Sequence, residues 1–301
     1  MSPQLAALVE KAIHPPAAPE VLVEDAGRRA QNLWWDDRDD SLWWSDGGTL
    51  QRLNLHTGIQ SVVYEGVPVG AFLPQEDGTW LLFREKDVAL LDFDKHAQVL
   101  PLFENVRFDG DRFNEVIADS EGRALLGTVR NGRPNGAGIY RFDEGGRLAK
   151  VLGGTGEAGG MGWNQAGDVL FWTCATTKTI CRCRYDAKRG ALTNRQVFHE
   201  CAPEEGTPAG LAVDEEGTLW SARRGSGVIL KIGENRRLMG QVTFPARDVT
   251  SVVFGGQDHR TVFASTADET GSSKIFVLQS PVPGMPQRRT RVDTQLDRPR
   301  G

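Results

Sequence analysis

Polar turns followed by short apolar or aromatic runs recur along the chain. Six segments share this form: "DDRDDSLWWSD", "PQEDGTWLLF", "ADSEGRALLGT", "NQAGDVLFWT", "VDEEGTLWSA" and "GGQDHRTVFAST". Their apolar runs begin near Leu42, Trp80, Ala124, Val169, Leu219 and Val262, at intervals of 38, 44, 45, 50 and 43 residues. Repeats of this length that hold several short strands are typical of the blades of a β-propeller.

Each apolar run is followed by a strand in which polar and apolar residues alternate, as in "TLQRLNLHTG" and "VILKIGENRR". Alternation with a period of two places one side chain in the core between blades and the next in water. A fourth strand, such as "IQSVVY" or "RQVFHE", follows the next turn. The pattern therefore predicts an all-β fold: a six-bladed β-propeller over residues 21–280, with four-stranded antiparallel blades around a central tunnel.

The two ends of the chain lack this pattern. Residues 1–20 contain "LAALVEKAI", which we expect to form a short helix within an otherwise irregular segment, ended by Pro15 and Pro16. Residues 281–301 are rich in Pro and Arg and are expected to form a flexible tail. The sequence has neither a basic leader followed by a cleavage site nor an apolar run of about 18–20 residues. We therefore expect a cytoplasmic protein with no membrane partner.

Charge and cysteine content narrow the classes of function. The chain has 35 Lys and Arg against 40 Asp and Glu, a net charge of -5, with no basic stripe among aromatic residues. Nucleic-acid binding is therefore not expected, and a small-molecule ligand is favoured, with the oligomeric state left open. Cys174, Cys181, Cys183 and Cys201 lack the C-x2-C element of common zinc sites. We expect reduced structural thiols, with a metal site or a disulfide as alternatives.

Several longer segments resemble the family of senescence marker protein (regucalcin), gluconolactonase and luciferin-regenerating enzyme. The resemblance spans Leu22 to Leu278 and is carried by "NLWWDDRDDSLWWSD", "DRFNEVIADSEGRALLGT", "GGMGWNQAGDVLFWT", "TPAGLAVDEEGTLWSARRGSGVILKI" and "DVTSVVFGG". It implies a six-bladed propeller with a divalent cation, such as Ca²⁺, Zn²⁺ or Mn²⁺, at the top of the tunnel. In the family, a Glu, an Asn and an Asp hold this cation, which polarises a sugar-lactone carbonyl and activates water.

This chain departs from the family at each of the three ligand positions. Gln31 stands in place of the Glu, Gly159 in place of the Asn and Ala209 in place of the Asp. A hard cation prefers several oxygens with net negative charge, whereas only Gln31 offers a side-chain oxygen here. We therefore predict no metal cofactor and keep Gln31 as a substrate-binding candidate. The alternative is that a loop shift brings in Glu157, two residues before Gly159.

The substrate side of the family's site is better preserved. The family's Arg-Phe-Asn-Asp stands here as Arg112, Phe113, Asn114 and Glu115. The resemblance implies that Arg112 and Asn114 orient an oxygenated ring, because both can bind hydroxyl or carbonyl oxygens. Glu115 is the candidate general acid or base. Cys174 stands where the family carries an Asp facing the tunnel, so it is a further substrate-binding candidate, with a nucleophile or a small filler residue as alternatives.

The sequence thus predicts a gluconolactonase-like hydrolase of the carboxylic ester class, acting on a sugar-lactone-like ligand without the family's divalent metal. Two alternatives remain open: a pseudoenzyme that binds a small molecule without turnover, and a metal-free isomerase or lyase. An interaction scaffold fits any propeller and gains no specific support.

Overall fold

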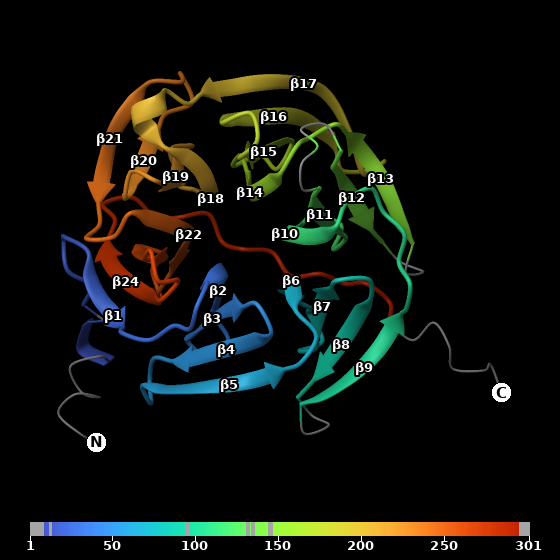
Figure 1. Cartoon of the computed structure of the whole chain (residues 1–301), viewed down its shortest axis with the longest axis horizontal. Helices are drawn as coiled ribbons and strands as arrows, with labels where there is room; N and C mark the ends of the chain where they lie inside the picture. Colours follow the sequence, from blue (N-terminus) through green and yellow to red (C-terminus); the bar gives the residue numbers. More distant parts are fainter. Residues whose placement is uncertain are drawn as a thin grey trace.

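Short antiparallel strands arranged around a common centre make up the computed structural model (Figure 1), which describes residues 9–11, 14–93, 97–130, 133, 136–143 and 147–294. Four separate sheets each contain four consecutive strands. These are β2 (Gln31–Asp36), β3 (Ser41–Asp46), β4 (Thr49–Asn54) and β5 (Ile59–Glu65); β6 (Val69–Pro74), β7 (Trp80–Arg84), β8 (Val88–Asp92) and β9 (Gln98–Phe103); β10 (Arg112–Ala118), β11 (Ala124–Val129), β12 (Gly138–Phe142) and β13 (Leu148–Gly153); and β14 (Ala158–Trp163), β15 (Val169–Cys174), β16 (Thr179–Asp186) and β17 (Ala191–Glu200).

The remaining strands form one eight-stranded sheet. Its strands are β1 (Glu20–Val23), β18 (Thr207–Val213), β19 (Leu219–Arg224), β20 (Val228–Ile232), β21 (Leu238–Thr243), β22 (Asp248–Gly255), β23 (Thr261–Ala267) and β24 (Ser273–Gln279). A single pair, Arg224 with Asp248, joins β18–β21 to β22–β24, and β1 pairs with β24. The all-β propeller is confirmed. The expected six separate four-stranded sheets are corrected to four such sheets and one eight-stranded sheet, because β19 and β22 meet at this pair.

The apolar runs in the sequence correctly predicted where the second strand of each repeat begins. We expected these strands to begin near Leu42, Trp80, Ala124, Val169, Leu219 and Val262. The strands β3, β7, β11, β15, β19 and β23 begin at those residues or one residue earlier. The large apolar side chains of these strands fix their positions, because they pack between neighbouring sheets. Trp43 of β3, for example, packs against Trp80 of β7 with ring centroids 4.2 Å apart.

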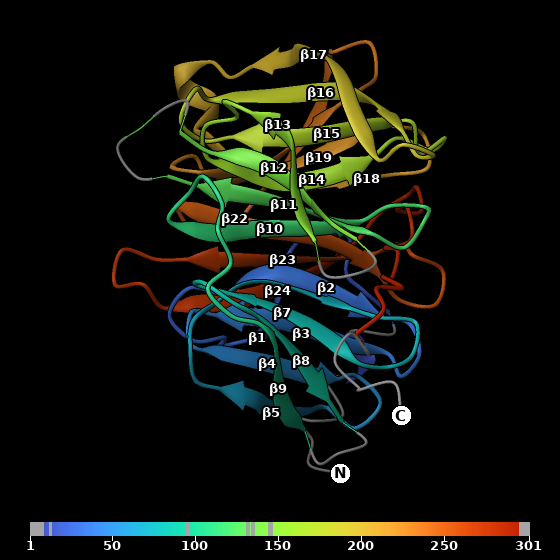
Figure 2. The ribbon, with the colours of Figure 1, turned by 90° about the vertical axis from the view of Figure 1, so that its right-hand side faces the viewer.

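The innermost strands follow one another around the centre in the order β2, β6, β10, β14, β18 and β22, and β22 contacts β2 again. They run along the short axis of the molecule, as the side view shows (Figure 2). Each has a shift in register, located between Gln31 and Trp34, Val69 and Ala71, Phe113 and Glu115, Gly159 and Met161, Pro208 and Leu211, and Val249 and Ser251. A bulge of this kind bends a strand and redirects its side chains.

These shifts bring neighbouring inner strands into contact through polar groups. Asn32 Nδ2 donates a hydrogen bond to the Gly70 carbonyl at 2.8 Å. Thr250 Oγ1 donates to the Ala30 carbonyl at 2.8 Å. We call this set of redirected positions around the tunnel the bulge ring: Asn32, Gly70, Asn114, Gly160, Ala209, Gly210 and Thr250.

The C-terminal segment differs from its expectation as a flexible tail. Residues 281–294 run across the middle of the molecule, as the red trace in Figure 1 shows. Gln287 Oε1 accepts a hydrogen bond from the Trp35 amide at 3.0 Å, and the Thr290 amide donates to the Pro74 carbonyl at 3.0 Å. Thr290 and Val292 are buried. The expectation of a loose tail is therefore wrong for residues 281–294, because their backbone and side chains satisfy polar groups at the ends of the inner strands. Residues 295–301 lie outside the described part.

Most of the predicted N-terminal helix, "LAALVEKAI", also lies outside the described residues. Residues 9–11 of this segment are described, and they are helical. No helix in the described part of the chain is long and apolar enough to cross a membrane.

Candidate active site

A pocket opens at one end of the tunnel, at the level of the bulge ring. Its walls come from the inner strands and from the ends of β15 and β19. The lining residues are Gln31, Asn32, Arg112, Asn114, Glu115, Glu157, Gly159, Gly160, Thr173, Ala175, Pro208, Ala209, Gly210, Arg224 and Thr250. The structure thus brings together the residues predicted from the sequence, with the exception of Cys174.

Cys174 does not line this pocket. It is fully buried at the end of β15, whereas its neighbours Thr173 and Ala175 line the pocket. Successive side chains of a strand point to opposite faces, so the thiol faces away when its neighbours face the pocket. Its prediction as a substrate-binding residue is corrected: Thr173 and Ala175 have the place expected for Cys174.

The bulge in β10 explains how two adjacent residues reach the same pocket. A regular strand would send Asn114 and Glu115 to opposite faces, but the register shift between Phe113 and Glu115 lets both line the pocket. Arg112 Nη1 donates to Asn114 Oδ1 at 2.7 Å, and Asn114 Nδ2 donates to the Ala158 carbonyl at 3.0 Å. The side-chain amide of Asn114 therefore holds the guanidinium of Arg112 in place and links β10 to β14.

Glu115 is partly buried and lines both this pocket and a second cavity, whose walls include Trp34, Met161 and Met285. Its carboxylate accepts hydrogen bonds from two backbone amides, those of Val116 at 3.3 Å and of Gly160. Burial raises the pKa of Glu115 to about 7, and the two hydrogen bonds oppose this rise. Because its pKa lies near neutrality, the side chain can both accept and return a proton.

Arg224, at the end of β19, is a pocket residue that the sequence analysis missed. Its Nη2 lies 3.6 Å from Glu157 Oε1, and its Nε is buried without a hydrogen-bond partner in the described part of the chain. Burial lowers the pKa of Arg112, and the positive charges of Arg224 and Arg29 lower it further, against the effect of Glu157. Two guanidinium groups thus stand close enough to repel each other at the same pocket.

A signal for Arg224 was present in the strand pattern. The alternation in "LWSARR" places Arg223 and Arg224 on opposite faces of β19, and the arginine nearer the strand end faces the pocket.

Gln31, Gly159 and Ala209 all line the pocket, as their alignment with the family's ligand positions predicted. A Cβ atom on Gly159 would lie 3.2 Å from Asn114 Nδ2 and 3.3 Å from Thr173 Oγ1, so these two side chains occupy part of the space of a larger residue. Two carboxylates line the pocket, those of Glu115 and Glu157. Across the described residues, the one group of three His, Cys, Asp or Glu side chains with closely spaced ligand atoms lies elsewhere.

Comparisons with known proteins agree with this architecture. The family model described as SMP-30/Gluconolactonase/LRE-like region matches residues 30–268. Pentonolactonase XacC of Haloferax volcanii is 30% identical over 254 residues, which cover 83% of this chain and 85% of that protein. The 6-deoxy-6-sulfogluconolactonase of Pseudomonas putida is 27% identical and covers 83% of this chain and 90% of its own length.

The crystal structure of a calcium-binding regucalcin from Agrobacterium tumefaciens shares the fold, with a TM-score of 0.84 at 20% identity over 92% of this chain and 98% of that one. On the extent of these matches and the arrangement of the tunnel pocket, the chain belongs to the SMP-30/gluconolactonase/LRE-like family.

Proposed function

We propose that this protein hydrolyses a small sugar-lactone-like ester with Glu115 as general acid and base, and without the divalent cation of its family. The proposal rests on the position of Glu115, a desolvated carboxylate that shares one pocket with the guanidinium groups of Arg112 and Arg224. The relatives named as lactonases support the choice of substrate class.

The donor set of the pocket supports a reaction without a hard cation. Gly159 and Ala209 have no side-chain donor, and Gln31 offers one neutral oxygen. Glu157 lies 3.6 Å from Arg224, and Asn114 Oδ1 already accepts a hydrogen bond from Arg112. Ca²⁺ and Mg²⁺ prefer several anionic oxygens, and two nearby guanidinium groups oppose their binding. The residues present do not fit the family's metal.

In the proposed reaction, the Glu115 carboxylate takes a proton from a water molecule whose oxygen attacks the carbonyl carbon of the lactone. The guanidinium N–H groups of Arg112 and Arg224 stabilise the negative charge that develops on the carbonyl oxygen. The ring C–O bond then breaks, and protonated Glu115 returns its proton to the departing alkoxide. The product is a hydroxy acid, and Glu115 is again ionised.

The two arginines also favour a substrate that carries an acidic group. The unpartnered Nε of Arg224 is a buried donor at the pocket wall. A carboxylate, sulfonate or phosphate on the sugar would satisfy this donor, because a guanidinium binds planar or tetrahedral anions through paired hydrogen bonds.

A lactone panel tests the proposal. Wild-type protein should hydrolyse at least one aldonolactone and should prefer acidic lactones. The Glu115→Gln variant should still bind these lactones but should not hydrolyse them. Calorimetric binding by the wild type with no turnover of any lactone would overturn the enzyme assignment and favour a binding protein.

We also propose to count the eight-stranded sheet as two blades, β18–β21 and β22–β24 with β1, which restores a six-bladed arrangement. The single residue pair between the two halves and the separate inner strands β18 and β22 support this count.

A further inference from the structure

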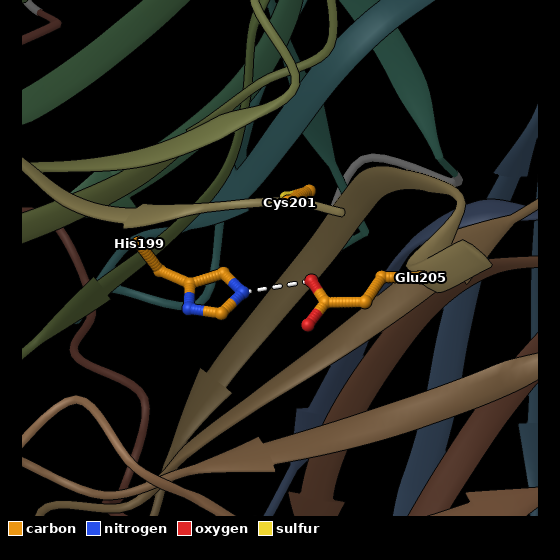
Figure 3. Close-up of side chains that lie close together, drawn as sticks. All are labelled: His199, Cys201 and Glu205. Carbon is orange, nitrogen blue, oxygen red and sulfur yellow. Dashed lines mark hydrogen bonds and ion pairs between the residues drawn. The ribbon is translucent and has the colours of Figure 1, made fainter. Parts of the chain in front are cut away.

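A second group of reactive side chains lies outside the tunnel pocket, between β17 and β18. His199 is near the end of β17, Cys201 follows that strand, and Glu205 ends the short 3-10 helix η1 (Pro203–Glu205). Figure 3 shows the imidazole of His199 pointing at the carboxylate of Glu205, with Cys201 above them in that view. His199 Nε2 lies 2.7 Å from Glu205 Oε2, and one nitrogen, the sulfur and one carboxylate oxygen all lie within 4.8 Å of one another.

The backbone holds these three side chains together. The Cys201 amide donates to the Lys178 carbonyl at 2.9 Å, which fixes the chain as it leaves β17. Pro203 begins η1, and Gly206 turns the chain with a φ of 77° that favours glycine. Ser226 Oγ donates to the Glu205 carbonyl at 2.9 Å, so the second end of the segment is also tied down. The cluster is therefore set by backbone anchors on both sides.

A thiolate, an imidazole and a carboxylate are the three kinds of protein ligand that zinc uses. Around a tetrahedral zinc ion with bonds of about 2.0–2.3 Å, ligand atoms lie roughly 3–4 Å apart. Here the His199 nitrogen and a Glu205 oxygen lie 2.7 Å apart in a hydrogen bond, and the sulfur lies within 4.8 Å of both, so the imidazole and the carboxylate would have to separate slightly when a metal binds. The soft sulfur ligand disfavours Ca²⁺ and Mg²⁺ and favours zinc or a similar transition metal.

Arg223 supplies a second, independent observation. Its side chain is fully buried, and its Nη1 lies 2.6 Å from Cys201 Sγ. Its Nε and Nη2 have no hydrogen-bond partner within the described ranges. Burial raises the pKa of the Cys201 thiol and the neighbouring Arg223 guanidinium opposes that rise, so a metal ion would have to displace the thiol proton when it binds.

The charges of the cluster can balance with a metal present. The thiolate and the Glu205 carboxylate would offset the charge of a divalent ion, whereas the positive charge of Arg223 beside the sulfur would weaken its binding. A hydrogen bond from Arg223 to the metal-bound sulfur is the kind of outer contact that orients a ligand.

We propose that His199, Cys201 and Glu205 form a zinc site with an open fourth position, separate from the tunnel pocket. Arg223 and Arg224, adjacent on β19, face this site and the pocket respectively. The zinc would tie the end of β17 to the segment that leads into β18.

Cobalt titration of metal-free protein tests the site. One equivalent of Co²⁺ should give a sulfur-to-cobalt charge-transfer band in the near ultraviolet and intense visible bands of tetrahedral geometry, and one equivalent of Zn²⁺ should displace it. Cys201→Ser should abolish the near-ultraviolet band, and His199→Ala should weaken binding at least about tenfold.

Matched controls separate the site from general effects of substitution. Cys174→Ala removes a buried cysteine that is not one of the three proposed ligands, and His56→Ala removes a histidine that pairs with Asp40 without a thiol. Both should keep the wild-type spectrum. Glu205→Gln serves as a second ligand variant in case Cys201→Ser does not fold. A wild-type spectrum without the thiolate band, or unchanged Co²⁺ affinity in Cys201→Ser and Glu205→Gln, would overturn the zinc site whatever the outcome of the lactone assays.

Discussion

Among single residues, Glu115 matters most for the proposed reaction. Its carboxylate is the one that reaches the deep part of the tunnel pocket, and burial raises its pKa to about 7. A carboxylate with this pKa is poised for proton transfer at neutral pH, whereas an exposed one would already be fully ionised and a weaker base.

Glu115→Gln should lower kcat/KM by about 10²–10⁴-fold, because the amide cannot take the proton from water. For the wild type, kcat/KM should rise with pH through about pH 7 and then level off, because the ionised carboxylate is the active base. A pH-rate profile with a range of lactones measures this. A flat profile from pH 5 to 9 would contradict the role of Glu115.

The same substitution should stabilise the fold above neutral pH. A raised pKa means that the folded protein holds a proton that the unfolded chain loses between the usual pKa of 4.5 and about 7. Stability from this group is therefore present at low pH and is lost as pH rises through that window. At pH 8, Glu115→Gln should increase the free energy of unfolding by about 1–3 kcal/mol, with little change at pH 4.5. Urea unfolding at both pH values measures the difference, and equal effects at both would argue against a raised pKa for Glu115.

Arg224 should matter for catalysis more than an ordinary surface arginine. Arg224→Met removes a pocket cation and should lower kcat/KM for acidic lactones about tenfold or more. Arg189, whose side chain is 83% exposed, is the matched control, and Arg189→Met should leave kinetics unchanged. Equal effects of the two substitutions would remove Arg224 from the proposed site.

At the scale of elements, the bulge ring accounts for the shape of the pocket. The sequence pattern located the second strands because large apolar side chains repeat there, as at Trp80 and Leu219. The register shifts could not be predicted in this way, since they depend on contacts between different sheets. The bulges place Asn114 and Glu115 on the same side, and the strand register at Thr173 turns Cys174 away.

Gly160 gives a direct test of the bulge ring. Its φ is 28°, and a Cβ atom there would lie 2.2 Å from the Ala209 carbonyl oxygen. Gly160→Ala should therefore cost about 2–4 kcal/mol of unfolding free energy, because backbone has to move. Gly153→Ala is the control, since its Cβ would meet Lys150 Cδ at 3.8 Å. Similar, small losses in both variants on denaturant unfolding would mean that the inner strands are not closely apposed at Gly160.

At the scale of the whole molecule, the C-terminal segment is part of the folded body. Its Pro-rich and Arg-rich composition is typical of a disordered tail, and the sequence alone gave no sign of the polar groups that receive it. Those groups, such as the Pro74 carbonyl and the Trp35 amide, become available only when the inner strands are assembled around the tunnel. The His199, Cys201 and Glu205 cluster escaped notice for a similar reason, since its spacing matches no common zinc motif.

Removal of residues 281–301 should lower the thermal midpoint by at least several degrees. The truncation removes the buried side chains of Thr290 and Val292, and the Trp35 amide loses its hydrogen-bond acceptor. Removal of residues 295–301 leaves those contacts in place and should have little effect. Calorimetry of the two truncated proteins distinguishes these cases. Equal midpoints for both would return the segment to the status of a loose tail.

The proposed function requires the family's fold to hydrolyse lactones without the family's metal. The most direct measurement is lactone hydrolysis by metal-depleted protein in the Cys201→Ser background, which removes the proposed zinc site from consideration. We predict the same kcat/KM with chelator present and after addition of Ca²⁺, Mn²⁺ or Zn²⁺. Activity that is lost with the chelator and restored by one of these ions would show that the reaction needs a metal.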